Sequence, residues 1–211
     1  MIVVGITGGI GTGKSTVGKY ILSKGFPFIS SDLNAKTIMN SDSELQKQLV
    51  TQFGEKVLAD GFINSPFLAE KLFGDTNEKN RNFVNNLVHP KTISLMMEQV
   101  EAFEEKGESI VFVESALLYE VSLEDGFDYI IVVDAKEEIR IERTLMRSKE
   151  TREQIVERIN AQLSQKWKVQ QADFVLENNK GIEDLYRGTD FLLSFLPSLP
   201  PKSFENPEEE E

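Results

Sequence analysis

The chain of 211 residues contains no cysteine and only one histidine, His89. Without cysteine there is no disulfide and no thiol chemistry, which favours an intracellular, cytoplasmic enzyme. No apolar run approaches the roughly 18 residues that a membrane span needs. The chain also enters its first apolar segment without a charged and then apolar leader. These absences predict a protein with no membrane partner.

Positive charge is also scarce. The formal net charge is −12 at pH 7, which argues against a nucleic-acid-binding surface. The negative charge is unevenly distributed along the chain, because residues 140–168 carry eight Lys or Arg residues against four Glu residues. A basic segment in an acidic protein fits a polyphosphate partner, although an ordinary solvated helix face would have the same composition.

A glycine-rich motif stands near the start of the chain. Residues 8–16 read Gly-Gly-Ile-Gly-Thr-Gly-Lys-Ser-Thr, and Gly, four residues and then Gly-Lys-Ser is the spacing of a P-loop. An apolar run at residues 2–4 precedes the motif and reads as a buried strand. A run that suits a helix follows at residues 14–24, with Gly25 as its C-terminal cap. Strand, loop and helix are the context that a P-loop needs.

The residue types of this motif suit a nucleoside triphosphate. Small residues let the backbone N–H groups of residues 9–14 curl around an anion, and the helix start adds its positive end. We expect Lys14 to reach the β and γ phosphates and the Ser15 hydroxyl to ligate Mg²⁺. A dinucleotide site would need glycine where this chain has Thr16. The expected nucleotide-binding residues are Gly9, Ile10, Gly11, Thr12, Gly13, Lys14, Ser15 and Thr16.

Carboxylates follow two further expected strands. Asp32 comes just after an apolar run at residues 26–29, and Glu114 ends another run at 110–113. Ligands of parallel α/β sheets bind at the carboxyl ends of the strands. Asp32 is therefore a candidate base or metal ligand, although aspartate is also a good N-cap for a helix over residues 33–39. Glu114 could hold a magnesium-bound water, as a Walker B acid does.

The whole chain reads as a three-layer α/β fold with a five-stranded parallel sheet, because five apolar strands alternate with helices. The last two strands are expected at residues 129–133 and 173–176. Residues 33–106 hold no convincing strand and read as short helices, with a break at His89-Pro90. The expected units are a nucleotide-binding core of residues 1–32 and 107–196, a helical substrate-binding insertion of residues 33–106, a helical lid of about residues 140–168, and a disordered acidic tail of residues 197–211.

These motifs are compatible with three classes of protein, namely a regulatory GTPase, a small-molecule kinase and a non-catalytic nucleotide sensor. No Asp-x-x-Gly occurs, and residues 179–182 read Asn-Lys-Gly-Ile, with isoleucine where GTPases have aspartate. A helical insertion after the second strand and an arginine-rich segment after the fourth fit a kinase. The insertion would hold the acceptor, and the lid would close over ATP and exclude water.

The chain resembles the dephospho-coenzyme A kinase family up to about residue 195. The P-loop alone is unspecific, but its combination with the later motifs is specific. The resemblance rests on residues 5–16, Asp32, Leu87-Val88-His89-Pro90, Leu117-Leu118-Tyr119-Glu120, Arg143, Arg147, Gln162, Ala172-Asp173 and Asn178-Asn179-Lys180-Gly181.

The resemblance implies transfer of the ATP γ-phosphoryl group, with Mg²⁺, to the ribose 3′-hydroxyl of dephospho-coenzyme A. This is the last step of coenzyme A biosynthesis. Another small-molecule or nucleoside monophosphate kinase, or a sensor, is the alternative. The resemblance implies that Asp32 is the catalytic aspartate, that Arg143, Arg147 and Asn178 lie near ATP, and that Asp32, His89, Leu117 and Tyr119 lie at the acceptor. Phosphoryl-transfer chemistry adds Lys14 and Arg147 to the expected catalytic residues, and the P-loop and strand-end arguments place Ser15 and Glu114 at the metal.

Two positions depart from the family pattern. The family often has Asp-Ala-Asp where this chain has Ser30-Ser31-Asp32, so any metal-holding role of the first acid is lost or passes to Glu114. The family usually has proline before Leu-Leu, and this chain has Ala116. That change would loosen the loop without removing a chemical group.

Overall fold

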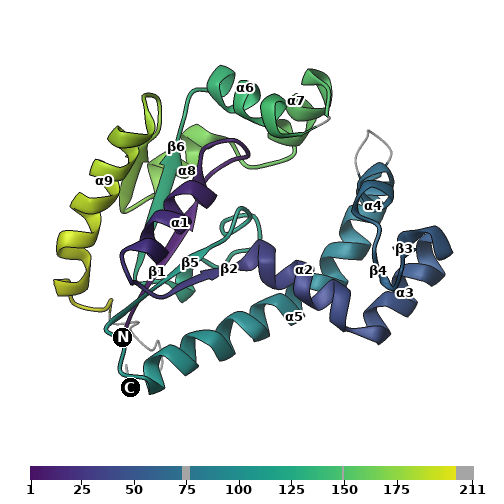
Figure 1. The fold of residues 1–211 in the computed structure, drawn as a ribbon, viewed down its shortest axis with the longest axis horizontal. Coiled ribbons are helices and arrows are strands. Elements are labelled where there is room, and N and C mark those ends of the chain that lie inside the picture. The colour runs from purple at the N-terminus through teal and green to yellow at the C-terminus, as the bar shows by residue number, and fades with distance from the viewer. Residues whose placement is uncertain (73–76, 149, 203–211) are drawn as a thin grey trace, which may run out of the picture.

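A computed structural model describes residues 1–72, 77–148 and 150–202. The chain folds around a five-stranded sheet with the strand order β2-β5-β1-β6-β7 (Figure 1), and all neighbouring strands are parallel. This confirms the predicted α/β fold. The strands are β1 (Ile2–Thr7), β2 (Phe28–Ser30), β5 (Ile110–Glu114), β6 (Tyr129–Asp134) and β7 (Phe174–Glu177).

Both faces of the sheet are buried, because successive side chains of a strand point to opposite faces. In β5, Ile110 and Phe112 join the cluster under α1 (Lys14–Ser23) and α9 (Ile182–Phe195). Val111 and Val113 join the cluster on the opposite face, where α5 (Glu78–Glu105) packs. This burial on two sides explains why the strands read as continuous apolar runs rather than alternating ones.

The carboxyl ends of three strands meet at one edge of the sheet. In the strand register Glu114 of β5 lies beside Ile6 of β1 on one side and beside Ser30 of β2 on the other. The P-loop follows β1, and α2 (Ser31–Ser41) follows β2 directly. The sheet therefore places the P-loop, the start of α2 and Glu114 next to one another, as right-handed crossovers predict.

The segment between β2 and β5 forms an insertion with its own apolar core, which includes Leu45, Leu49 and Val88. The prediction of no strand was wrong, because β3 (Leu58–Ala59) and β4 (Phe62–Ile63) form a short antiparallel hairpin. Its turn places Asp60 and Gly61 at φ values of 53° and 81°, which glycine and aspartate tolerate best. The remaining elements are α3 (Ser43–Phe53), η1 (Glu55–Val57) and α4 (Ser65–Leu72).

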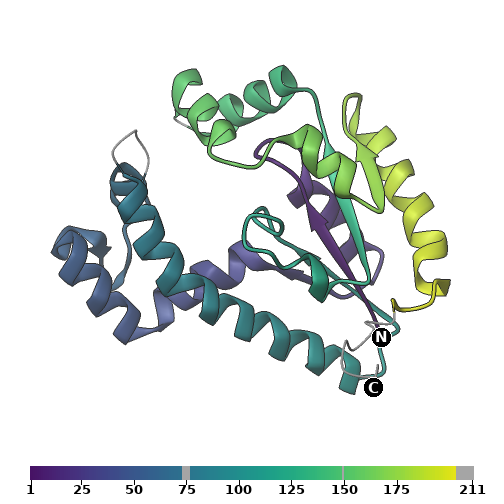
Figure 2. The same ribbon diagram turned by 180° about the vertical axis from the view of Figure 1, so that it is seen from behind.

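The predicted break at His89-Pro90 was also wrong, because Pro90 lies inside the continuous helix α5. Proline removes one backbone hydrogen bond and usually ends or kinks a helix. Here the residues on either side are held by packing. Val88 lies in the core of the insertion, and Met96 lies in the core beneath the sheet. One helix therefore runs from the insertion to the far end of the sheet (Figure 2).

Three helices lie between β6 and β7, and their first two stand at the carboxyl edge, across from the insertion (Figure 1). They are α6 (Glu137–Arg147), α7 (Arg152–Asn160) and α8 (Gln165–Gln171). Thr151 opens α7 with a capping box, and the Ser164 side chain caps α8 by accepting from the Trp167 N–H at 3.2 Å. No helix in the described part of the chain is apolar over enough of its length to cross a bilayer.

The end of the described chain packs against the sheet. The sequence placed residues 197–211 in a disordered tail, but η3 (Leu196–Ser198) leads into a segment with defined contacts. The Lys202 N–H donates to Asp128 Oδ1 at 2.7 Å, and the Tyr129 hydroxyl donates to the Pro200 carbonyl oxygen at 2.8 Å. The prediction was therefore wrong for residues 197–202, and residues 203–211 lie outside the described part.

We expect a chain that ends at Leu196 to melt a few degrees below a chain that ends at Lys202. The shorter chain loses both hydrogen bonds, which contribute about 1 kcal/mol each. In a domain of this size each kcal/mol shifts Tm by roughly 2–4 °C. Differential scanning calorimetry of the two chains measures the difference, and equal melting temperatures would show that residues 197–202 add nothing to stability.

Candidate active site

The P-loop between β1 and α1 needs its glycines for conformation and for space. Gly11 and Gly13 have φ values of 79° and 106°, which L side chains rarely adopt. A Cβ atom on Gly13 would lie 2.3 Å from Asn178 Nδ2, and one on Gly11 would lie 2.4 Å from the Arg140 carbonyl oxygen. Only glycine therefore allows the lid and the β7–α9 loop to approach the phosphate-binding backbone this closely.

Lys14 lies buried at the start of α1. Its Nζ donates to the carbonyl oxygens of Gly8 at 2.8 Å and Gly9 at 3.2 Å. Burial lowers the pKa of Lys14 below its ordinary value, and the charges of Glu114 and Asp32 oppose that shift. The structure therefore brings one ammonium group and two carboxylates together at the carboxyl edge of the sheet, as the sequence predicted.

Asp32 lies in the first turn of α2, and the helix is capped by another residue. The Ser30 side chain accepts a hydrogen bond from the Leu33 N–H at 3.4 Å, which makes Ser30 the N-cap. The alternative interpretation of Asp32 as the helix cap was therefore wrong. Asp32 is exposed and lines two adjoining cavities between the sheet and the insertion. Its carboxylate is free to meet a ligand there.

Glu114 is buried at the end of β5, with 4% of its surface exposed. Its Oε2 accepts a hydrogen bond from the Ser30 hydroxyl at 2.9 Å. Burial and the charge of Asp32 raise the pKa of Glu114, whereas Lys14 and the Ser30 hydrogen bond oppose the rise. Ser30, which stands where the family often has an acid, thus connects Glu114 to the helix that carries Asp32.

The donor set at this edge fits a hard divalent cation. Ser15 is exposed in the first turn of α1, and Glu114 adds a carboxylate. Among the described residues no group of three or more His, Cys, Asp or Glu side chains could hold a metal by itself. Mg²⁺ suits such a site, because it usually takes one or two protein oxygens and completes its shell with water and substrate phosphates.

A cavity of about 270 Å³ opens on the side of the P-loop that faces α9. Asn178 is fixed there, because its Nδ2 donates to the Thr12 carbonyl oxygen at 2.8 Å and its Oδ1 accepts from Arg143 Nη2 at 3.1 Å. The structure thus brings together several of the predicted ATP-binding residues and Arg147. The lining residues are Gly11, Gly13, Thr16, Arg143, Arg147, Asn178, Ile182 and Leu185.

A larger cavity of about 550 Å³ lies on the other side, between the insertion and the lid. A smaller cavity of about 190 Å³ adjoins it, and both are lined by Asp32, His89 and Leu117. His89 is half-buried, and burial lowers its pKa, which favours the neutral ring at pH 7. Arg81 and Gln162 line the larger cavity, and the sequence did not single them out for this site.

Tyr119 does not reach either of these cavities. It is 6% exposed, and its ring packs edge-on against Trp167 with ring centroids 5.3 Å apart. Burial raises the pKa of Tyr119 to about 12. The structure therefore brings Leu117, Asp32 and His89 together as predicted, but gives Tyr119 a place in the core. A motif shows which residues are adjacent in the chain but not where each side chain points.

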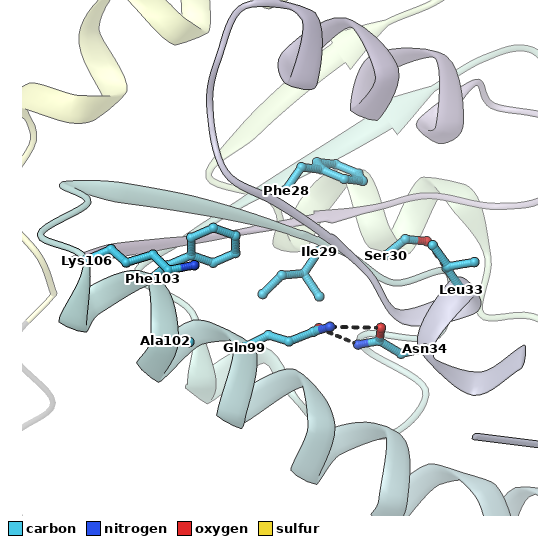
Figure 3. A pocket seen from close by; sticks show the side chains of 9 residues that line it. All are labelled: Phe28, Ile29, Ser30, Leu33, Asn34, Gln99, Ala102, Phe103 and Lys106. Atoms are coloured by element: carbon cyan, nitrogen blue, oxygen red, sulfur yellow. Dashed lines mark hydrogen bonds between the residues drawn. The ribbon is translucent and has the colours of Figure 1, made fainter. Parts of the chain in front are cut away.

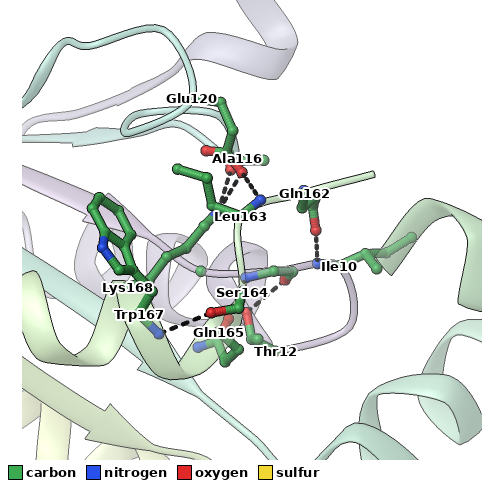
Figure 4. Close-up of polar contacts among 12 residues, drawn as sticks. Ile10, Thr12, Ala116, Glu120, Gln162, Leu163, Ser164, Gln165, Trp167 and Lys168 are labelled. Carbon is green, nitrogen blue, oxygen red and sulfur yellow. Dashed lines mark hydrogen bonds and ion pairs between the residues drawn. The ribbon is translucent and has the colours of Figure 1, made fainter. Parts of the chain in front are cut away.

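Three residues at the P-loop were missed by the site prediction (Figure 4 draws two of them). The Gly9 N–H donates to Gln165 Oε1 at 2.8 Å, and the Ile10 N–H donates to Gln162 Oε1 at 2.9 Å. Arg140 Nε donates to the Ile10 carbonyl oxygen at 2.8 Å. Gln162 belongs to the family resemblance and Arg140 to the basic segment, so both carried a signal. Gln165 carried none.

A further cavity of about 240 Å³ lies between the edge strand β2 and α5 (Figure 3). Asn34 and Gln99 face each other across it, with hydrogen bonds of 2.7 Å and 3.3 Å between their amide groups. The two amide side chains thus hydrogen-bond to each other. None of the predicted site residues lines it.

Comparison with known proteins gives consistent matches. A family model described as dephospho-CoA kinase matches residues 2–184. The chain is 36% identical over 181 residues to the dephospho-CoA kinase of Listeria monocytogenes serotype 4b, a match that covers 85% of this chain and 90% of the relative.

Solved structures show the same similarity. A crystal structure of a protein from Thermus thermophilus matches with a TM-score of 0.75 and 33% identity, covering 92% of this chain and 96% of the other. A dephospho-CoA kinase from Campylobacter jejuni matches with a TM-score of 0.69 and 24% identity, covering 93% and 97%. The second match bears on the fold alone.

Proposed function

The chain belongs to the dephospho-CoA kinase family, and from that membership we propose how its residues phosphorylate the ribose 3′-hydroxyl of dephospho-coenzyme A. The reaction consumes ATP and gives coenzyme A and ADP, the last step of coenzyme A biosynthesis. One observation carries the assignment of roles. Asp32 lines the large cavity, and its charge acts on Lys14 in the P-loop. A carboxylate thus stands between the phosphate-binding loop and a place for the acceptor.

ATP is assigned to the P-loop and to the cavity beside Asn178. The backbone N–H groups of the loop and Lys14 neutralise the β and γ phosphates. Arg143 and Arg147 line the same cavity and add positive charge from the lid. Gly13 lets Asn178 approach the loop, which supports a place for the adenine near residues 178–181.

Dephospho-coenzyme A is assigned to the larger cavity. Its 550 Å³ volume suits part of a nucleotide-sized acceptor. Leu117 and His89 form walls shared with the smaller apolar cavity, and Arg81 brings a positive charge that suits the diphosphate of the acceptor. The insertion of residues 33–106 is therefore the acceptor-binding unit. ATP is bound by the core, which comprises residues 1–32 and 107–196, together with its lid of about residues 140–168.

The transfer step follows from this placement. The acceptor 3′-oxygen attacks the γ-phosphorus, the bond from that phosphorus to the β–γ bridging oxygen breaks, and ADP leaves. Asp32 orients the hydroxyl and accepts its proton. Such a transition state is loose, so placement and charge neutralisation provide most of the catalysis. A divalent cation held by Ser15 and Glu114 supplies further neutralisation of the phosphates when bound.

We also propose Mg²⁺ as that cation and the cytoplasm as the place of action. The donors are all oxygens, which supports magnesium, and the metabolic role of the family supports the cytoplasm. The net charge of −12 supports a protein without a nucleic-acid partner.

An ADP-release assay with several acceptors tests the assignment. The purified chain is given ATP and Mg²⁺ together with dephospho-coenzyme A, pantetheine phosphate, a nucleoside monophosphate or shikimate. We expect turnover with dephospho-coenzyme A only. Turnover with a nucleoside monophosphate alone would indicate a different kinase. ADP release that is the same with every acceptor would indicate an ATPase or a sensor.

We expect Arg147→Lys to lower kcat/KM for ATP about tenfold. Arginine can bind phosphate with two parallel hydrogen bonds, whereas lysine offers one point charge. A lost charged hydrogen bond costs about 1.5–3 kcal/mol. The matched control is Arg152→Lys, because Arg152 pairs with Glu138 on the exposed surface of the lid at 2.6 Å. Equal kinetics in the two variants would remove Arg147 from the site.

A further inference from the structure

Glu120 ends the Leu-Leu-Tyr-Glu motif and has no role in the mechanism above. Its Oε1 accepts hydrogen bonds from Lys168 Nζ at 2.7 Å and from the Leu163 N–H at 3.1 Å (Figure 4). Lys168 Nζ also donates to the Ala116 carbonyl oxygen at 3.3 Å. Residues 116–120, which we name the acceptor loop, are thus joined at both ends to Lys168.

The ion pair between Glu120 and Lys168 costs more free energy to bury than an apolar contact at the same place would. The Lys168 side chain is 0% exposed and that of Glu120 is 15% exposed. A buried ammonium is costly even when paired, and replacing buried pairs by apolar side chains is often neutral or stabilising. Glu120 Oε2 is buried too and has no hydrogen-bond partner among the described residues. A role beyond stability would account for this cost.

The segment that holds the acceptor loop also holds the P-loop. Within residues 162–168, which we name the bridging segment, Gln162 accepts from the Ile10 N–H and Gln165 accepts from the Gly9 N–H. Gln165 Nε2 also donates to the Val133 carbonyl oxygen at 3.1 Å, at the end of β6. One short segment therefore contacts the acceptor loop with Lys168 and the phosphate-binding backbone with two glutamines.

Both ends of this connection reach the cavity assigned to the acceptor. Glu120 and Leu117 line it from the acceptor loop, Gln162 lines it from the bridging segment, and Ile10 lines it from the P-loop. We propose that Glu120 and Lys168 are positioning residues, whose ion pair sets the distance between the acceptor loop and the P-loop and so aligns the acceptor hydroxyl with the γ-phosphate. The inference rests on the proposed kinase activity. A displacement of about 1 Å can cost roughly 100-fold in rate.

The test uses Lys168→Met and Glu120→Asp. The first keeps the length of the side chain and removes its charge. The second keeps the charge and shortens the reach by one methylene. For both we expect kcat with dephospho-coenzyme A to fall about 10- to 100-fold, with ATP affinity by calorimetry within about threefold of wild type. We also expect more ADP per coenzyme A formed, because water replaces the misplaced hydroxyl as the nucleophile and releases inorganic phosphate.

The ratio of ADP to coenzyme A separates positioning from stability. The neutral double variant Glu120→Gln/Lys168→Met leaves no buried charge unpaired, so we expect it to melt near wild type and to keep the kinetic defect. A double variant with wild-type kcat and a wild-type ratio would overturn the proposal. An unchanged ratio of ADP to coenzyme A in Glu120→Asp would also overturn the proposal. If the variants that carry Lys168→Met do not fold, the result for Glu120→Asp decides.

The matched control is Glu138→Gln, which removes the exposed lid pair with Arg152 and should change neither kcat nor the ratio. The wild-type chain must first phosphorylate dephospho-coenzyme A in the same assay. Failure there would reject the proposed function, whereas a normal wild type with unaffected variants would reject only the positioning role of Glu120 and Lys168.

Discussion

Asp32→Asn is expected to lower kcat by about 10²–10⁴, the range for loss of a positioned general base. Asparagine keeps the size of the side chain but accepts a proton far less readily. The helix start should survive, because Ser30 is the N-cap of α2. ATP affinity should change little, since the P-loop supplies that binding. The measurements are kcat, ATP binding by calorimetry and a melting curve.

Asp42→Asn is the matched control for this prediction. Asp42 caps α3 by accepting from the N–H groups of Glu44 and Leu45, both at 3.0 Å. Asparagine can keep that cap, so kcat should stay at the wild-type value. A folded Asp32→Asn variant that binds ATP and turns over within about threefold of wild type, a barrier change of only ~0.7 kcal/mol, would exclude Asp32 as the base.

Lys14→Met is expected to lower kcat by about 10²–10³, the cost of losing one preorganised charge-stabilising donor, and to weaken ATP binding. Lys14 is the buried cation beside two carboxylates, so its loss leaves Asp32 and Glu114 facing the phosphates without a counter-charge. Methionine avoids burying an ammonium but leaves the buried Glu114 carboxylate without its nearby cation, and because these two effects oppose each other we expect Tm to change little. Kinetics and a melting curve on the same preparation test both statements.

Lys19→Met provides the comparison, because Lys19 is exposed on the same helix. We expect it to match wild type in turnover and ATP affinity. Lys14→Met with kcat within about tenfold of wild type would contradict the role of Lys14 at the phosphates. A large fall in Tm without a fall in kcat would instead make Lys14 a structural residue.

The sheet could be predicted because its signal is local. Apolar strands, the glycine spacing of residues 8–16 and the turn residues around them all agreed. The course of α5 could not be predicted in the same way, since local rules place a break at Pro90. Packing of Val88 in one core and Met96 in another outweighs that rule. The hairpin of the insertion was missed because its strands of two residues are too short to show a period.

The site residues also divide into those with a signal in the local sequence and those that depend on packing between distant residues. Asp32 and Glu114 could be found because carboxylates at strand ends of a parallel sheet meet at one edge. Gln165 could not, because its contact with Gly9 joins residues that are 156 positions apart. Tyr119 was assigned to the acceptor site through the family resemblance of residues 117–120, whereas its ring lies against Trp167. Side-chain direction in an irregular loop is decided by packing and leaves no simple pattern in the sequence.

The most direct test of the kinase assignment is to identify the product. The chain is incubated with ATP, Mg²⁺ and dephospho-coenzyme A, and the product is analysed by mass spectrometry and ³¹P NMR. We expect one added phosphate, present as a monoester on the ribose 3′-oxygen, and no such product from Asp32→Asn on the same timescale. Phosphate at another hydroxyl, or ATP consumed with dephospho-coenzyme A unchanged, would contradict the assignment.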